Sequence, residues 1–313
     1  MRRYILHRLA LLLPTLILVS MLVFGLQQLL PGDPALALAG EQRDPEVVAF
    51  IRHRYHLDQP LPVQYALWLG GVLEGDLGES IRIQRPVLQL VAEKLPVTLE
   101  LTLFAMAIAL AIGIPAGVVA AVERGTAWDL AANAFALWGL STPNFWLGIL
   151  LILLFSVDLG WLPASGYVSP FENLGRNLAT LIMPAFVLGN ALAAVIMRHT
   201  RSSMLHALQS DYVRTARAKG LSEMRVILRH ALPNALQPVI TLGALEFGAL
   251  LSGAVLTEQV FTIPGFGKLI VDAVFNRDYA VVQGVVLVTA TFYSLLNLAA
   301  DVLYAVVNPR LRG

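Results

Sequence analysis

The chain has 313 residues, of which 57% are hydrophobic and 14% are charged, and its net charge is +1. Soluble domains are about 45–50% apolar and about 25% charged, so this composition excludes an ordinary soluble domain and predicts a polytopic membrane protein. No cysteine is present, which excludes disulfides, thiolate zinc sites and cysteine nucleophiles.

The N-terminal segment predicts a membrane-spanning helix. Arg2, Arg3 and Arg8 precede an uncharged run over residues 9–32, which exceeds the ~20 apolar residues that a bilayer core requires. The run is too long for a signal peptide and lacks a small-residue cleavage site. We expect Pro14 to kink the helix without breaking it, because neighbouring helices can satisfy the freed carbonyl.

Residues 33–96 are the long polar stretch predicted for the outer side of the membrane. They hold nine acidic and six basic residues, and apolar positions at helical spacing over residues 44–57 predict short helices in a small cap. His53 and His56 have a spacing that would suit metal ligation on a helix. A third ligand is missing from the sequence pattern, so we expect surface histidines and no metal site.

Five further apolar runs predict five more spans, at residues 101–122, 130–157, 177–197, 231–257 and 279–300. Six spans place both termini on one side. On this topology the cytoplasmic parts hold 13 basic and 4 acidic residues, the outer parts hold 9 and 14, and three acids lie inside spans. The asymmetry follows the positive-inside rule and predicts cytoplasmic termini, where Arg310 and Arg312 also lie.

The spans carry small residues and three acids. Gly113 and Gly117, with the fifth-span glycines, permit close packing of helix backbones. Glu246 lies near the middle of the fifth span, where an ionisable group needs a wet cavity or a partner. Two interpretations stay open, since Glu246 could attract the ammonium group of a peptide or pair with a basic residue of another subunit. Glu100 and Asp301 lie near span ends and are expected to act as caps or hydrogen-bonding groups.

Residues 198–235 are a basic stretch between the fourth and fifth spans, with seven Arg or Lys residues against two acids. Helices are predicted over residues 203–219 and 222–231, with Gly220 ending the first and Pro233 interrupting the second. Ser222 is the predicted N-cap of the second helix. This predicts a helix, a turn and a helix against the cytoplasmic face; the alternative is a solvated loop that only sets topology.

The segment after the fifth span predicts a tight re-entrant turn on the outer side. Pro264, Gly265 and Gly267 are turn-forming residues, and Phe261 and Phe266 are expected to anchor the turn at the membrane interface. A plain interfacial loop is the alternative.

Enzymatic functions find little support in the sequence. Gly267-Lys268 lacks the preceding Gly and following Ser or Thr of a phosphate-binding loop, so we expect no nucleotide site. An intramembrane serine protease would need a histidine at membrane depth, and all six histidines lie at span ends or in loops. A channel lacks a repeated polar motif that would form a ring.

The spacing of Ala216, Gly220, Leu232 and Pro233 resembles the cytoplasmic coupling loop of binding-protein-dependent ABC importers. Arg214, Thr215 and His230 depart from the usual loop pattern. The sequence resembles the dipeptide and oligopeptide permease subunits through motifs in the same order along the chain: MRRYILHRL at 1–9, PGDP at 31–34, LDQPLPVQY at 57–65, GDLGES at 75–80, DYVRTARAKGLS at 211–222, EQVFTIPGFGKL at 258–269 and NRDYAVVQ at 276–283.

This resemblance implies an all-α type I ABC importer permease fold with six transmembrane helices. The implied organisation is an N-terminal helix at residues 1–32, an external cap at 33–96 and a permease core at 97–313 that includes the coupling loop, 198–235. The resemblance also implies three sets of site residues. They are Asp211, Tyr212, Arg214, Ala216, Ala218, Gly220, Leu232 and Pro233 for coupling to the ATPase; Glu246, Ser252 and Thr257 for the translocation path; and Phe261, Pro264, Gly265 and Gly267 for the outer gate.

The implied function is that of a non-catalytic permease subunit in the bacterial inner membrane, importing dipeptides or oligopeptides by alternating access. Nickel or glutathione are alternative cargoes. The implied partners are a second homologous permease, two ATPase subunits that use ATP and Mg, an extracytoplasmic substrate-binding protein and membrane lipid, without nucleic acid. This chain is expected to bind no cofactor itself.

Overall fold

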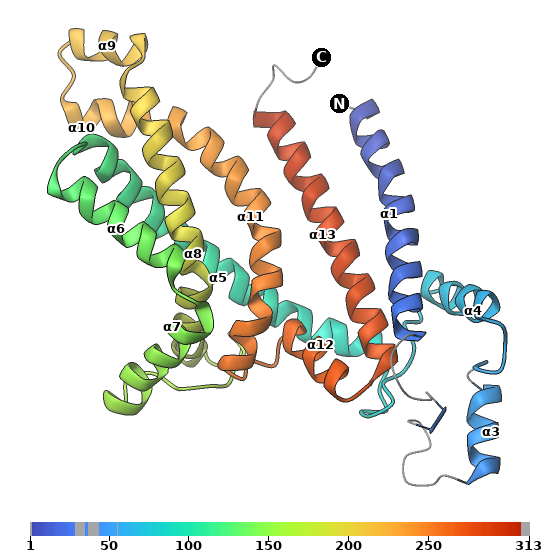
Figure 1. The fold of residues 1–313 in the computed structure, drawn as a ribbon. Helices are drawn as coiled ribbons and strands as arrows, with labels where there is room; N and C mark the ends of the chain where they lie inside the picture. The colour runs from blue at the N-terminus through green and yellow to red at the C-terminus, as the bar shows by residue number, and fades with distance from the viewer. Residues whose placement is uncertain (1, 29–34, 37–43, 55, 308–313) are drawn as a thin grey trace. The chain divides into compact units, whose positions relative to one another are not determined.

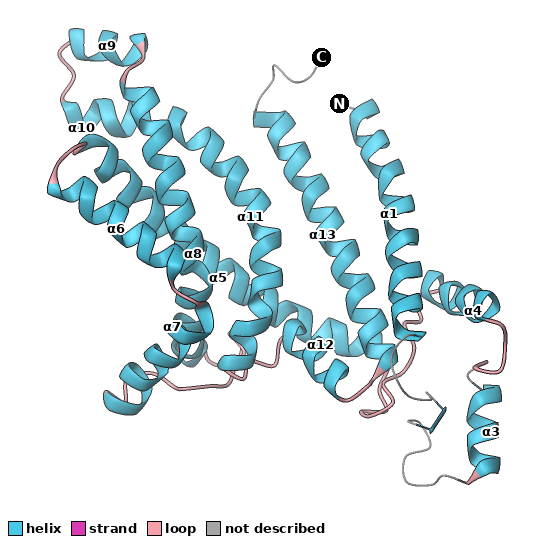
Figure 2. Ribbon diagram, in the orientation of Figure 1, coloured by secondary structure: helices cyan, strands magenta, loops and turns pink. Residues whose placement is uncertain are grey.

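The computed structural model describes residues 2–28, 35–36, 44–54 and 56–307, which form helices joined by loops (Figures 1 and 2). The all-α class is confirmed over this part of the chain, where Glu79 and Pro86 form an isolated β-bridge. The chain divides into two compact units, residues 1–95 with 269–298 and residues 96–268 with 299–313. The PGDP motif, Arg310, Arg312 and the side chain of Asp301 lie outside the described residues.

The first unit contains α1 (Arg2–Gln28), α3 (Pro45–Arg54) and α4 (Leu61–Leu73). Pro14 lies inside α1, as expected, and α3 occupies most of the predicted amphipathic run. Aromatic packing joins α1 to α4, because the Phe24 ring lies 5.5 Å from that of Tyr65 and 6.0 Å from that of Trp68. Residues 33–96 therefore include short helices.

Two of the sequence motifs meet within the first unit. The Ser80 hydroxyl, at the end of GDLGES, donates a 2.5 Å hydrogen bond to buried Asp278, in NRDYAVVQ. α13 (Tyr279–Val307) begins just beyond this contact and passes close to the start of α5 (Val87–Val122). A Cβ at Gly284 would lie 2.6 Å from the Val87 side chain, so this crossing requires glycine.

The second unit is arranged around α8 (Leu174–Leu208), drawn in yellow in Figure 1, which contacts both α6 (Ala127–Ser141) and α11 (Leu232–Val260). In its most apolar stretch 72% of the residues are buried, whereas the corresponding stretches of α5 and α11 are 28% buried. α5 packs closely on α8, since a Cβ at Gly113 or Gly117 would lie 2.6 Å from a backbone oxygen of α8. The predicted use of these glycines in close helix packing is confirmed.

The apolar run at residues 130–157 does not form the single straight helix that the sequence predicted. α6 ends at Ser141, and α7 (Asn144–Leu151) and η1 (Ile152–Asp158) continue after a bend of 102°. Pro143 causes the bend, because a residue before proline avoids the helical region and Thr142 accordingly has a ψ of 120°. Continuous hydrophobicity concealed this break.

Four helices are long and apolar enough to cross a membrane, and the bent pair raises the possible number to five among the described residues. The four run over Val87–Val122, Leu174–Leu208, Glu223–Val260 and Tyr279–Ala299. The described apolar part of α1 covers 16 residues, Ala10–Gly25, and is shorter than a full span. The chain is therefore a multi-pass protein, while the count of six spans and the side of the termini stay predictions.

Candidate functional site

The predicted cytoplasmic helix at residues 203–219 is two helices. α8 runs to Leu208, and α9 (Asp211–Ala218) begins after a turn. Ser210 has extended backbone angles, φ −77° and ψ 154°, and its hydroxyl donates to the Ala207 carbonyl. Serine competes in this way with the helix ladder and favours helix ends, so the chain changes direction here.

Gly220 ends α9, as predicted, in a Schellman motif. The Gly220 amide donates to the Arg217 carbonyl at 2.9 Å, and the Leu221 amide donates to the Ala216 carbonyl at 3.4 Å. Gly220 has a φ of +77°, a conformation that glycine adopts without steric cost. A Cβ at Gly220 would meet no atom within 4 Å. Gly220 is therefore required by its backbone conformation, and not by a close approach of two helices.

The sequence predicted that Pro233 interrupts the second helix of the basic stretch. The structure shows that the helix continues through Pro233. α10 (Glu223–Arg225), the π-helix η2 (Val226–Ala231) and α11 form one continuous helix over Glu223–Val260. Ser222 is at the N-cap position, as predicted. The wider π turn before Pro233 accommodates its missing N–H. The Asn234 side chain satisfies the His230 carbonyl with a 2.8 Å hydrogen bond.

We call residues 209–231 the coupling element, and it has a hydrophobic core of its own at the end of α8. Val213 of α9, Val226 of η2 and Met204 of α8 are fully buried in one cluster. Burying each such side chain contributes roughly 1.5–3 kcal/mol. Figure 1 shows α9 beyond the end of α8. This core fixes α9 on the helices that carry it.

The predicted coupling residues divide into a buried and an exposed set. Ala216 is 6% exposed and belongs to the core of the coupling element, and Leu232 is half-buried. The side chains that reach the surface are Asp211, Tyr212, Arg214, Ala218 and Pro233, and Gly220 is exposed as well. Only part of the predicted set is therefore available at the surface to contact another subunit.

Ion pairs close the turn between α9 and α10. The Arg217 guanidinium donates to both carboxylate oxygens of Glu223, from Nε at 3.0 Å and Nη2 at 2.5 Å. Arg214 pairs with Asp211 within α9. These side chains are largely exposed, and such pairs contribute about 0–1 kcal/mol each.

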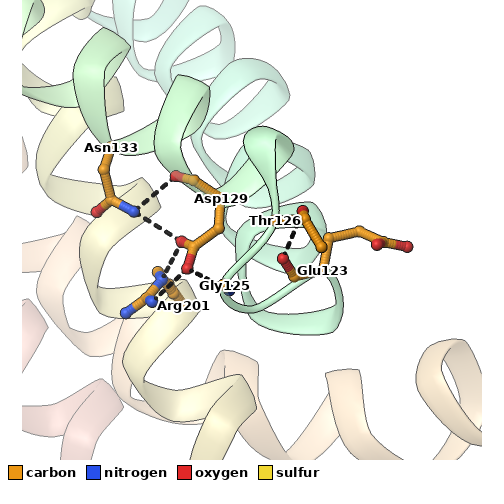
Figure 3. A network of polar contacts seen from close by, with 6 residues as sticks. All are labelled: Glu123, Gly125, Thr126, Asp129, Asn133 and Arg201. Carbon is orange, nitrogen blue, oxygen red and sulfur yellow. Dashed lines mark hydrogen bonds and ion pairs between the residues drawn. The ribbon is translucent and has the colours of Figure 1, made fainter.

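A polar network that the sequence did not predict ties the α5–α6 connection to α8 (Figure 3). Arg201 donates to both oxygens of Asp129, with distances of 2.8 and 2.9 Å. The Gly125 amide and the Asn133 side chain donate to the same carboxylate at 3.1 and 2.7 Å. Asp129 is only 8% exposed and fully paired. The sequence shows only an acid at the end of a short connection between two spans, and it gives no indication of a partner 72 residues away.

The structure does not bring the predicted translocation residues to one face of α11. Thr257 is 2% exposed, Glu246 is half-buried and Ser252 is exposed. At about 100° per residue, Glu246 and Thr257 lie within about 20° of each other around the helix, whereas Ser252 lies more than 100° away from both. Their assignment to a path stays a prediction.

The turn predicted for the outer side, residues 261–267, is largely buried within the second unit. Phe261 and Phe266 are 1% and 8% exposed, so the expectation that they anchor at the membrane interface is wrong. Pro264 lies at the centre of a narrow turn in which the Gly265 amide donates to the Ile263 carbonyl at 2.8 Å. The turn closes around Glu258, a fully buried carboxylate that the sequence interpretation counted only as an outer acid.

Glu100 is a hydrogen-bonding residue, as expected. Its carboxylate accepts from the Tyr167 hydroxyl at 2.6 Å and from the Asn177 side chain at 2.9 Å. Burial and the hydrogen bond to Glu100 raise the pKa of Tyr167, so the phenol is a neutral donor at physiological pH. The loop at residues 159–173 is thereby held against α5 and α8.

Comparison with known proteins agrees with this architecture. Residues 113–313 match the family described as binding-protein-dependent transport system inner membrane component, and residues 1–102 match the N-terminal part of the same kind of membrane component. An inward-facing MetNI methionine ABC transporter structure aligns with a TM-score of 0.57 and 20% identity, covering 70% of this chain and 97% of that one. This likeness shows the fold.

Similar sequences cover the whole chain. A di/tripeptide transport system permease protein of Pseudomonas aeruginosa is 45% identical, and a glutathione transport system permease protein of Salmonella typhimurium is 46% identical; each match covers 100% of this chain and 99% of the relative. A putative peptide transport system permease protein of Brucella melitensis is 44% identical over the same shares. The chain therefore belongs to the binding-protein-dependent transport system inner membrane component family, as a permease subunit of an ABC importer.

Proposed function

We propose that this permease subunit imports short peptides, with dipeptides or oligopeptides as cargo, through a path shared with a second homologous permease. The observation that supports this most is whole-chain similarity to permeases named for di/tripeptide and glutathione transport. Glutathione is itself a short peptide, so both relatives indicate one class of cargo. Nickel is the alternative from a different chemical class.

The proposed complex also contains two ATPase subunits and an extracytoplasmic binding protein. The chain has no phosphate-binding loop at Gly267-Lys268, so ATP and Mg would be used by the ATPase subunits. In this account the binding protein delivers the cargo on the outer side, and ATP binding and hydrolysis drive alternating access. The permease itself forms no covalent bond with the cargo.

The coupling element is the proposed contact with the ATPase. Its hydrophobic core gives it a fixed shape, and its outer face carries Asp211, Tyr212 and Arg214 in exposed positions. A rigid element transmits a displacement to α8 and α11, to which it is joined directly, better than a solvated loop would. The Asp129–Arg201 network holds the neighbouring connection to the same helix.

Uptake by the reconstituted complex tests the cargo. Proteoliposomes with both permeases, the ATPase subunits and the binding protein are supplied separately with a dipeptide, a tetrapeptide, glutathione and Ni²⁺. We expect ATP-dependent uptake of a peptide, and vesicles without ATP serve as the control. Uptake of Ni²⁺ alone would contradict the proposed cargo while leaving the permease assignment intact.

The proposed orientation has cytoplasmic termini and an external cap, as the charge distribution predicts. A reporter fused after Arg312 should be cytoplasmic, and one inserted near Gly71 should be external. Finding both reporters on one side would contradict six spans with this orientation.

A further inference from the structure

Glu258 is a fully buried carboxylate in the last turn of α11, and it receives hydrogen bonds from two other segments. The Thr98 hydroxyl of α5 donates to Oε1 at 2.5 Å, and the Lys268 amide donates to Oε2 at 2.7 Å. The Thr98 oxygen accepts in turn from the Phe266 amide at 2.8 Å. Burying a carboxylate is unfavourable unless such bonds compensate for lost hydration, so this site strongly constrains its neighbours.

The glycines of the turn fit around this carboxylate. A Cβ at Gly265 would lie 2.3 Å from the Glu258 carboxyl carbon, and a Cβ at Gly267 would lie 2.8 Å from the Val255 backbone and 3.1 Å from the carboxylate. Any larger residue at position 265 would therefore displace the carboxylate. The conformation of the Pro-Gly-Phe-Gly segment therefore depends on its packing against Glu258 as well as on its own turn propensity.

The helix end at this turn is strained. The Ile263 amide donates to the Glu258 carbonyl at 2.9 Å and the Thr262 amide to the Gln259 carbonyl at 3.4 Å, which is a Schellman motif with Thr262 where glycine is usual. Thr262 has a φ of +51°. A β-branched residue rarely adopts this conformation and persists in it only when the surroundings impose it. The surrounding contacts of Glu258, Thr98 and Phe266 provide that constraint.

We propose that Glu258 is a positioning residue that joins the outer turn, residues 261–267, to Thr98 of α5, so that α5, the end of α11 and the turn move as one body during transport. The proposal rests on the function as an importer permease. It explains why a costly buried carboxylate lies beside Gly265 and Gly267 of the turn. A turn detached from α5 would move without the helix.

The first test separates coupling from folding. In the reconstituted complex, uptake and binding-protein-stimulated ATP hydrolysis are measured together for Glu258→Gln, Thr98→Val and the control Glu172→Gln, an exposed carboxylate in the same unit. We expect cargo imported per ATP to fall at least tenfold in the first two variants, with assembly retained, and to be unchanged in the control. Unchanged cargo per ATP in Glu258→Gln and Thr98→Val would overturn the proposal.

The second test concerns the contact itself and needs no cargo. Gly265→Ala should lower the thermal midpoint of the purified permease complex, whereas the control Gly175→Ala, where a Cβ makes an ordinary 3.5 Å contact, should not. The double variant Gly265→Ala/Glu258→Ala should lose less than the sum of the two single losses, because both changes break the same contact between the turn and the carboxylate. Additive losses would overturn the proposed contact. Absence of peptide uptake in the wild type would instead contradict the proposed cargo.

Discussion

Gly220 provides the sharpest test of how the coupling element is built. Glycine could be needed here for its backbone conformation or for close approach of two helices, and the sequence alone does not distinguish the two. Gly220 has a φ of +77° and open space around its α-carbon, which favours the first explanation. If glycine is needed for backbone conformation, Ala and Arg should have a similar cost and Asn a lower one. If it is needed for close approach, the cost should grow with side-chain volume. The series Gly220→Asn, Gly220→Ala and Gly220→Arg distinguishes them.

The expected magnitude follows from the left-handed conformation. A residue with a Cβ pays about 1–2 kcal/mol there, while asparagine tolerates it better. A free-energy change of this size multiplies the opened population of the turn by about 5–30. Ala and Arg should therefore be alike, because the Arg side chain projects into open space, and Asn should be closer to wild type.

The exchange rate of the Leu221 amide measures how often the turn at Gly220 opens, because that amide donates to the Ala216 carbonyl across the turn. We expect exchange to accelerate about 5–30-fold in Ala and Arg and less in Asn, with stimulated ATP hydrolysis falling in the same order. Exchange that rises steadily from Ala to Arg, without any advantage for Asn, would refute the conformational explanation.

Three further predictions concern other parts of the chain. Thr262→Gly should relieve about 1–2 kcal/mol of strain, offset by about 0.5–1 kcal/mol of unfolded-chain entropy, so the thermal midpoint should hold or rise; a fall would show that the threonine makes a needed contact. Gly117→Ala should cost about 1–3 kcal/mol, seen as a lower thermal midpoint, because the Cβ would lie 2.6 Å from the α8 backbone, while Gly25→Ala, with no atom within 4 Å, serves as the neutral control. Glu246→Gln should weaken uptake of free peptides more than of N-acetylated peptides if Glu246 binds a peptide ammonium group, and equal losses would indicate a structural role.

Most of the helices could be predicted from sequence because membrane helices are long uninterrupted apolar runs. α8 and α13 contain the runs predicted for the fourth and sixth spans, and the continuous helix over Glu223–Val260 contains the run predicted for the fifth. The bend at Pro143 could not be seen in the same way, since hydrophobicity continues through it. Local backbone rules would have found it, because Thr142 precedes a proline.

The candidate site was predictable where its signal is local. Gly220 and Ser222 are helix-end residues, and the structure places both at helix ends. The contacts of Glu258 and Asp129 are not local, as their partners Thr98 and Arg201 lie 160 and 72 residues away. No periodicity in one chain specifies such a pairing, because it depends on how helices pack in three dimensions.

Cross-linking tests the proposed contact between α9 and the ATPase. The chain has no cysteine, so Tyr212→Cys introduces a single thiol on the exposed face of α9, and Glu172→Cys places a control thiol in the loop that precedes α8. A reagent joining thiol to lysine is applied to the assembled, transporting complex. We expect cross-linking to an ATPase subunit from position 212 and none from position 172. Cross-linking from position 172 alone, with uptake intact, would contradict the proposed contact.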